Sequence, residues 1–320
     1  MGQLHILFDG NNTAYRCNCV TELYTKQGER TSAIVGVLNT THSTMVELEK
    51  RYNKPISEVI YAFDMGHSPR RKEVFPEYKS NRNKKEKTDE EKDWMSEFIS
   101  QANTLYEKLP LFGVKTYRKK GWEGDDLIYA LSDKLTELHP EDTVVIVSTD
   151  EDFHQLVSET VHLYSPVKQI LYTLENYEEL MGIPQDLFLT YKILKGDSSD
   201  GIPGIAGIGE KTGKSLVNTF GNLESLLSSK EELCKSKRTE KIFTRDGLNI
   251  LSRNNQLINL RDYVDISGIV DEVMSILEDE PFVDTNQCKD FLMKYQLTSI
   301  LVKYKKFIEA FEDMVENFSE

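Results

Sequence analysis

Three stretches of sequence decide the fold: LHILFD (residues 4–9), VIYAFD (residues 59–64) and VVIVSTD (residues 144–150). Each is a short apolar run that ends in an aspartate. Runs of this kind, separated by stretches with helical periodicity, are typical of parallel strands covered on both faces. Because such sheets bind ligands beyond the carboxyl ends of their strands, we expect the three aspartates to share a site.

The rest of the sequence predicts that the chain is divided into two regions. Residues 161–164 are expected to form a further strand, and residues 76–109 combine a polar start with a helical pattern. A glycine-dense loop and amphipathic helices follow. We therefore predict an α/β fold: a central, mostly parallel, twisted sheet flanked by helices over residues 1–186, and a mainly helical C-terminal region over residues 187–320.

Composition excludes few classes of protein. The chain has 320 residues, of which 39% are hydrophobic, and no apolar run is long enough to span a membrane. Its start, MGQLHILFDG, lacks the pattern of a signal peptide, so we expect the protein to stay in the cytoplasm where it is made. The four cysteines show no zinc-binding spacing, and we expect them to be reduced thiols.

Charge leaves the question of a nucleic-acid partner open. The net charge of −14 disfavours phosphate binding, but net charge says little about local charge. Eight basic residues gather in one segment: Arg70, Arg71, Lys72, Lys79, Arg82, Lys84, Lys85 and Lys87. The polar start of residues 76–109 is therefore either a solvated loop or a basic arm that handles a polyanion.

Nine acidic residues are candidate metal ligands. They are Asp9, Asp64, Glu123, Asp125, Asp126, Asp150, Asp152, Asp197 and Asp200. Any one pair of them could simply cap a helix or face solvent. If they converge, however, a cation must keep them ionised, and oxygen ligands without His or Cys favour Mg²⁺ or Mn²⁺. Two such ions suit the hydrolysis of a phosphodiester.

The loop GIPGIAGIGEKTGKS (residues 201–215) resembles a phosphate-binding P-loop only superficially. That motif needs a glycine at position 208, which is Ile208, and a preceding strand. The alternatives are a plain turn between helices, or a hairpin whose backbone N–H groups and following helix grip a phosphate backbone. In the second case, Lys211 and Lys214 supply positive charge. In PEYKSNR (residues 76–82), Tyr78 offers a ring for base stacking beside two cations.

Taken together, these residues resemble the 5′-nuclease (flap endonuclease) superfamily, especially its bacteriophage members. The similar segments follow the family's order: DGNNTAYR (9–16), AFD (62–64), FPEYKSNR (75–82), WEGDD (122–126), STDEDFHQL (148–156) and GDSSDGIPGIAGIGEKTG (196–213). The fifth and sixth are the most specific. The family often has alanines around its central acids, where this chain has Trp122 and Gly124. We expect altered packing there with intact metal ligation.

The resemblance implies roles for individual residues. Asp9, Asp64, Glu123, Asp125 and Asp126 would mainly serve a first metal site, and Asp150, Asp152, Asp197 and Asp200 a second. Asp150, Lys79 and Arg82 would be catalytic. DNA would be contacted by Arg16, Tyr78, Lys79, Arg82, Gly207, Gly209, Lys211 and Lys214. Residues 76–109 would form a helical arch for a 5′ strand, and residues 195–221 a helix–three-turn–helix motif that holds duplex DNA and is a candidate for a K⁺ ion.

The sequence therefore predicts a Mg²⁺-dependent nuclease on a PIN-like core. It would cut near 5′ ends or single-strand/duplex junctions during phage DNA replication or repair, in the cytoplasm of the infected host. Expected partners are 5′-flap DNA, RNA–DNA hybrids through an RNase H activity, and a single-strand-binding protein, with no membrane and a monomeric state. Two alternatives stay open: a PIN-like ribonuclease, and a non-catalytic DNA module that binds junctions. Beyond about residue 239, only a faint similarity to phage replication nucleases named RNase H remains.

Overall fold

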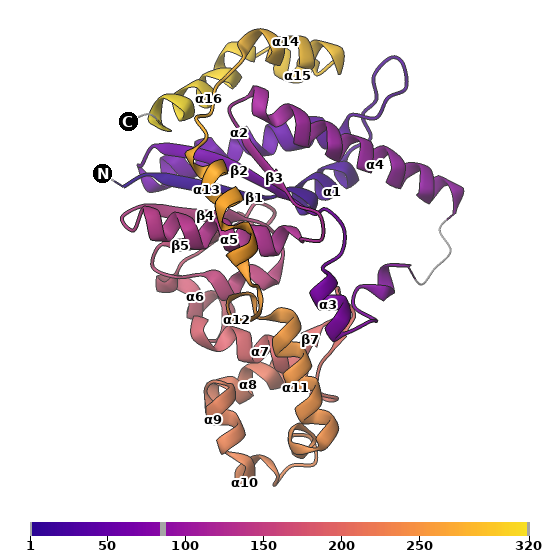
Figure 1. The fold of residues 1–320 in the computed structure, drawn as a ribbon, viewed down its shortest axis with the longest axis vertical. Coiled ribbons are helices and arrows are strands. Elements are labelled where there is room, and N and C mark those ends of the chain that lie inside the picture. Colours follow the sequence, from indigo (N-terminus) through magenta and orange to yellow (C-terminus); the bar gives the residue numbers. More distant parts are fainter. Residues whose placement is uncertain (1, 84–87, 319–320) are drawn as a thin grey trace.

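The computed structural model describes residues 2–83 and 88–318, and a six-stranded sheet forms its centre (Figure 1). The strands are β1 (Leu4–Asp9), β2 (Ile56–Phe63), β3 (Lys115–Arg118), β4 (Thr143–Val147), β5 (Val161–Ser165) and β6 (Ile170–Tyr172), in the order β3-β2-β1-β4-β5-β6. All neighbours are parallel except β5 and β6. The predicted fold class is confirmed, and the three aspartate-bearing stretches supply three adjacent strands.

Helices cover both faces of the sheet, which is why its central strands are apolar on every side. Side chains such as Ile6 and Phe8 point into one core, and Leu7 points into the other. The first core includes residues of α1 (Gly10–Val20), α2 (Ser32–Tyr52) and α4 (Asp89–Lys108). The second includes residues of α5 (Gly124–Leu138) and α6 (Leu174–Met181).

A small helical hairpin follows the sheet. It is built from α7 (Phe188–Lys195), β7 (Gly196–Asp197), β8 (Ile202–Pro203) and α8 (Glu210–Phe220). Two glycines allow the chain to turn so tightly. At Gly204 a Cβ atom would lie only 2.1 Å from the Lys195 carbonyl oxygen, and Gly196 adopts φ +75°.

Further helices connect the hairpin to the C-terminal part of the chain. After the hairpin come α9 (Leu223–Ser228), α10 (Lys230–Leu233), α11 (Arg245–Ile258), α12 (Leu260–Tyr263) and α13 (Val270–Glu278). The 3₁₀ helices are η1 (Ser80–Asn83), η2 (Leu109–Leu111), η3 (Glu151–Leu156), η4 (Gln185–Leu187), η5 (Glu240–Phe243) and η6 (Ile266–Ile269). The short α3 (Pro69–Val74) contacts α11.

The C-terminal helices return to the sheet. They are α14 (Thr285–Lys294), α15 (Thr298–Leu301) and α16 (Tyr304–Phe318), at the top of Figure 1, and α16 packs against β2. Phe307, Phe311 and Met314 enter the same core as Phe8. The expected boundary between residues 186 and 187 stays a prediction, but a C-terminal stretch of the chain shares a core with its first strand.

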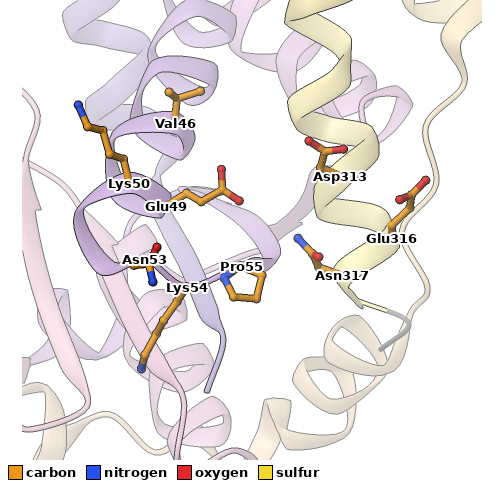
Figure 2. Close-up of a pocket in the computed structure, with 9 residues that line it drawn as sticks. All are labelled: Val46, Glu49, Lys50, Asn53, Lys54, Pro55, Asp313, Glu316 and Asn317. Carbon is orange, nitrogen blue, oxygen red and sulfur yellow. The ribbon is translucent and has the colours of Figure 1, made fainter. Parts of the chain in front are cut away.

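Several smaller observations complete the fold. No helix in the described ranges 2–83 and 88–318 is both long and apolar enough to cross a membrane. The cysteines are unpaired, with Cys17 and Cys288 buried and Cys19 exposed. A hollow of about 570 Å³ lies between the end of α2 and α16, and Figure 2 shows the residues that line it. Its lining includes Pro55, which immediately precedes β2, so the hollow lies at the amino ends of the strands.

Candidate active site

The three strand-end aspartates lie at one edge of the sheet, as predicted. Asp9 ends β1, Asp64 follows β2, and Asp150 lies three residues beyond β4. Asp9 accepts hydrogen bonds from the backbone N–H of Asn12 at 3.1 Å and from Ser148 Oγ at 3.0 Å. Since β1 pairs with both β2 and β4, the parallel register itself carries these carboxylates to a common edge.

The N-terminus of α5 brings three more acids to this edge. Glu123 caps the helix, and Asp125 and Asp126 lie in its first turn, where the helix dipole favours negative charge. The backbone N–H of Gly124 donates to Asp64 Oδ1 at 2.5 Å. A Cβ atom on Gly124 would lie 3.1 Å from that oxygen, so glycine allows the first turn of α5 to sit close to β2.

A second acidic group forms around η3 and the hairpin. Asp150 caps η3 by accepting the N–H of Asp152 at 2.9 Å, and Asp197 lies in β7. Lys192 of α7 lies between Asp152 and Asp197. Its ammonium is 3.0 Å from Asp152 Oδ1 and 2.8 Å from Asp197 Oδ2. The structure therefore brings Asp152 and Asp197 together around a buried lysine.

Arg71 holds the acids of α5 in the same way. Its guanidinium is buried and lies 2.8 Å from Glu123 Oε2, 2.8 Å from Asp125 Oδ2 and 2.9 Å from Asp126 Oδ1. In the sequence, Arg71 is only one of several clustered basic residues, and Lys192 is not among the predicted site residues. The available signal for Lys192 was its place inside the otherwise mainly apolar stretch FLTYKIL, ahead of the terminal Lys195.

Three residues of PEYKSNR contact the acids. Lys79 Nζ is 2.9 Å from Glu123 Oε2, and Arg82 is 2.8 Å from Asp200 Oδ1. The hydroxyl of Tyr78 lies within hydrogen-bond distance of both Glu123 Oε2, at 2.8 Å, and Asp200 Oδ2, at 3.0 Å. The expected exposed ring of Tyr78 is corrected here: it is 1% exposed because its hydroxyl serves buried carboxylates, and it cannot stack on a base without moving.

The electrostatics divide the acids into two kinds. Burial, with the nearby charge of Asp64, raises the pKa of Asp9 to about 7. Burial likewise raises the pKa of Asp150 to about 7 and that of Asp152 to about 8. Although burial alone would raise it, Arg71 and Lys79 lower the pKa of Glu123 to about 2.

Three of the candidate acids have no cationic partner among the residues that the structure describes. Among the residues that the structure describes, Asp9, Asp64 and Asp150 form no ion pair with Lys, Arg or His. In the same described residues, no three Asp, Glu, His or Cys side chains surround one point as ready metal ligands, because several acids turn toward Arg71, Lys79 and Lys192. The donor chemistry nevertheless fits a hard divalent cation, because Asp9, Asp64 and Asp150 are carboxylates whose pKa values are raised.

The remaining candidate residues lie on α1, on α8 or in the loop that precedes α8. Gly207 adopts φ +92° in the loop before α8, and Gly209 precedes that helix as its N-cap. Lys211 is exposed, while Lys214 pairs with Glu210 at 2.9 Å. Arg16 lies on α1, and one of its guanidinium nitrogens is buried without a hydrogen-bond partner among the described residues. Lys84, Lys85 and Lys87 lie outside the described residues, as does part of the expected arch.

Comparison with family models decides the relationship of this chain. Residues 4–182 match the N-terminal resolvase-like domain of 5′-3′ exonucleases, and residues 183–279 match their C-terminal SAM fold. The chain belongs to the 5′-3′ exonuclease family. The resemblance stated from the sequence is therefore confirmed.

Relatives within this exonuclease family include both short and long proteins. The chain is 29% identical over 283 residues to a 5′-3′ exonuclease of Buchnera aphidicola, covering 88% of this chain and 89% of that one. It is 30% identical over 279 residues to DNA polymerase I of Lactococcus lactis, covering 84% of this chain. The aligned region spans 30% of the length of that polymerase.

Solved structures show the same architecture. The flap endonuclease of bacteriophage T5, crystallised with DNA and metal ions, superimposes with a TM-score of 0.70 at 26% identity. The match covers 86% of this chain and 98% of that one. The catalytic core of Rad2 in complex with DNA shares the fold, with a TM-score of 0.53 at 16% identity.

Proposed function

We propose that this 5′-3′ exonuclease family member is a Mg²⁺-dependent, structure-specific 5′ nuclease that hydrolyses phosphodiesters near 5′ ends or single-strand/duplex junctions. One observation carries the proposal: Asp9, Asp64 and Asp150 converge at the sheet edge without a cationic partner among the described residues. Desolvation and neighbouring carboxylates raise their pKa values, so a divalent cation would favour their ionised forms.

In this proposal, Asp9, Asp64 and Asp150 hold the tightest divalent ion, with Asp125 beside them. Mg²⁺, or Mn²⁺ in its place, would activate a water for attack and neutralise charge on the scissile phosphate. Lys79 and Arg82 would turn from their carboxylate partners toward that phosphate and offset the charge that develops there. The remaining acids, Glu123, Asp126, Asp152, Asp197 and Asp200, would act through water or through a second ion.

The hairpin from α7 to α8 would grip duplex DNA through backbone N–H groups around Gly207 and Gly209, with Lys211 and Lys214 beside the phosphates. A K⁺ ion on its carbonyl groups belongs to the same proposal. The segment 76–109 would guide the 5′ single strand to the acids. Arg16, on the helix that follows Asp9, would contact a phosphate of the substrate strand.

We further propose the substrates, the oligomeric state, the location and a partner of the enzyme. The substrates would be 5′-flap DNA and RNA–DNA hybrids, and the enzyme would act as a monomer in the cytoplasm of a phage-infected bacterium. A single-strand-binding protein is the proposed partner. The core and helical regions would meet near residue 187.

The test is cleavage of a 5′-labelled flap duplex with and without Mg²⁺. Wild type should cut near the junction only with the metal, and Asp150→Asn should not cut while still binding the junction. Asp290→Asn, an exposed change on α14, is the matched control and should cut like wild type. Binding without metal-dependent cleavage in wild type would favour the junction-binding module. Cleavage of single-stranded RNA without any duplex would favour the PIN-like ribonuclease.

A further inference from the structure

Lys192 is a buried cation within the second acidic group. Its side chain is 2% exposed, and its ammonium lies 3.0 Å from Asp152 Oδ1, 2.8 Å from Asp197 Oδ2 and 3.3 Å from Glu151 Oε2. The Asp152 and Asp197 side chains are themselves 12% and 9% exposed. A buried ammonium therefore lies between two buried carboxylates.

The neighbouring first group is arranged differently. Asp9, Asp64 and Asp150 have no Lys, Arg or His partner within the parts of the chain that the structure covers. Opposite charge at ion-pair distance favours the ionised form of a carboxylate. Asp152 and Asp197 thus already have a cation at ion-pair distance, whereas the strand-end aspartates have none among the described residues.

The position of Lys192 on the backbone leaves it little freedom to move away. It lies on α7 between Tyr191 and Ile193, both buried in the core on that side of the sheet. Its neighbour Lys195 contrasts with it: the Lys195 side chain is 25% exposed and pairs with Glu151 alone at 3.0 Å. An exposed lysine can swing into solvent when a divalent ion arrives, but a buried one must first separate packed side chains.

We propose that Lys192 is a resident cation of the second acidic group, so that this chain binds one divalent ion tightly, at Asp9, Asp64 and Asp150, and a second only weakly. The ammonium occupies the space between Asp152 and Asp197 and repels a divalent ion at the same place. The inference rests on the proposed function only in assigning the tight ion to the strand-end aspartates. In catalysis, Lys192 is a positioning residue, because it acts through Asp152 and Asp197.

The test measures metal binding directly, without activity. Titration of the full chain with Mn²⁺, followed by the electron paramagnetic resonance signal of free Mn²⁺, gives the number and affinity of bound ions. Wild type should bind one ion tightly and a second at least about tenfold more weakly. Lys192→Met should tighten the second ion by about tenfold or more and leave the first unchanged. Lys195→Met, the matched control on the same helix, should behave as wild type.

Three results would overturn the inference: two ions of equal affinity in wild type, a second ion that Lys192→Met leaves unchanged, or one that it weakens. Near-ultraviolet circular dichroism checks the fold of each variant. Lys192→Gln provides a neutral side chain that still donates hydrogen bonds, and the wild-type stoichiometry tests the idea even if both variants unfold. Asp150→Asn separates the two proposals: it should abolish the tight ion. If wild type binds no tight ion, the proposed metal site fails, and the inference with it.

Discussion

The side-chain amide of Asn81 donates a hydrogen bond to the carbonyl oxygen of Ser198 over 3.0 Å. The same amide reaches the carbonyl oxygen of Ser199 at 3.2 Å. The backbone N–H of Lys79 adds a bond to the carbonyl oxygen of Asp200 at 2.8 Å. The η1 turn, which begins the segment expected to guide the 5′ strand, is thus fastened to the loop of the hairpin expected to hold duplex DNA.

We expect Asn81→Ala to reduce kcat/KM on a flap duplex by about tenfold, because two exposed neutral hydrogen bonds contribute about 0.7 kcal/mol each and 1.4 kcal/mol corresponds to a factor of ten. The loss should be much smaller on a 5′-labelled single strand, which does not engage the hairpin. Asn39→Ala removes an exposed amide from α2 and serves as control. Equal losses on both substrates would mean that Asn81 does not couple the two elements.

Asp150→Asn should raise the melting temperature of the metal-free protein by about 2 °C, since it removes one charge from a cluster of carboxylates and 1 kcal/mol corresponds to about 1.5 °C in a chain of this size. The pKa of Asp150 is raised to about 7, so its ionisation costs no stability below pH 3.8 and costs most above pH 7. The difference between variant and wild type should therefore grow from pH 5 to pH 8. A scan of thermal unfolding with a chelator present measures it, and a lower melting temperature at pH 8 would contradict the assignment.

Binding of a divalent ion should stabilise the folded chain. At 100 times its dissociation constant, a ligand contributes about 2.7 kcal/mol, so Mg²⁺ should raise the melting temperature of this 320-residue chain by about 4 °C. Asp64→Asn should lose most of this shift because it removes one of the three acids that would hold the ion. Glu178→Gln, a change on the exposed face of α6, should keep it. The same Mg²⁺ shift in Asp64→Asn and wild type would place the ion elsewhere.

The buried side chain of His5 should make stability depend on pH in the opposite direction to Asp150. At the amino ends of the strands, His5 Nδ1 lies 2.9 Å from Glu58 and Nε2 lies 3.0 Å from Asp142. Although burial lowers it, these two carboxylates raise the pKa of His5 above 6.5. The stabilisation is therefore fully present below pH 6.5 and is lost as the pH rises through the raised value.

We accordingly expect His5→Gln to lower the free energy of unfolding by about 2 kcal/mol at pH 5.5 and by much less at pH 9, since a hydrogen bond to a charged group contributes about 1.5–3 kcal/mol. Urea unfolding at the two pH values checks this. His67→Gln, at an exposed position, should change neither value. A larger loss at pH 9 than at pH 5.5 would show that His5 is neutral in the native state.

The fold and the position of the acids could be predicted because both follow from local patterns. An apolar run that ends in aspartate specifies a buried parallel strand, and parallel strands deliver their carboxyl ends to one edge. Asp9, Asp64 and Asp150 therefore needed no knowledge of tertiary contacts. The hairpin was likewise visible in its glycines, since Gly204 and Gly196 each meet a backbone requirement that other residues would violate.

The internal cations could not be predicted in this way. Arg71 and Lys192 find their partners in segments distant in the sequence, so no local spacing reports the pairing. The burial of Tyr78 could not be predicted either. A tyrosine among basic residues suggests an exposed ring, because the carboxylates that bind its hydroxyl are distant in the sequence. The chain beyond residue 239 carries few motifs, and its return to the sheet is a matter of tertiary packing alone.

That return makes the two ends of the chain mutually dependent. The Gln3 side chain donates to the Asn317 carbonyl oxygen, and the Asn317 side chain donates to Ile56 at the start of β2. The hairpin and its neighbouring helices are therefore spliced into the middle of a unit whose first and last segments close on each other. Deleting α14 to α16 would uncover an apolar face of the sheet and promote aggregation, whereas a circular permutant that joins the ends and opens the chain within the hairpin region should still fold cooperatively.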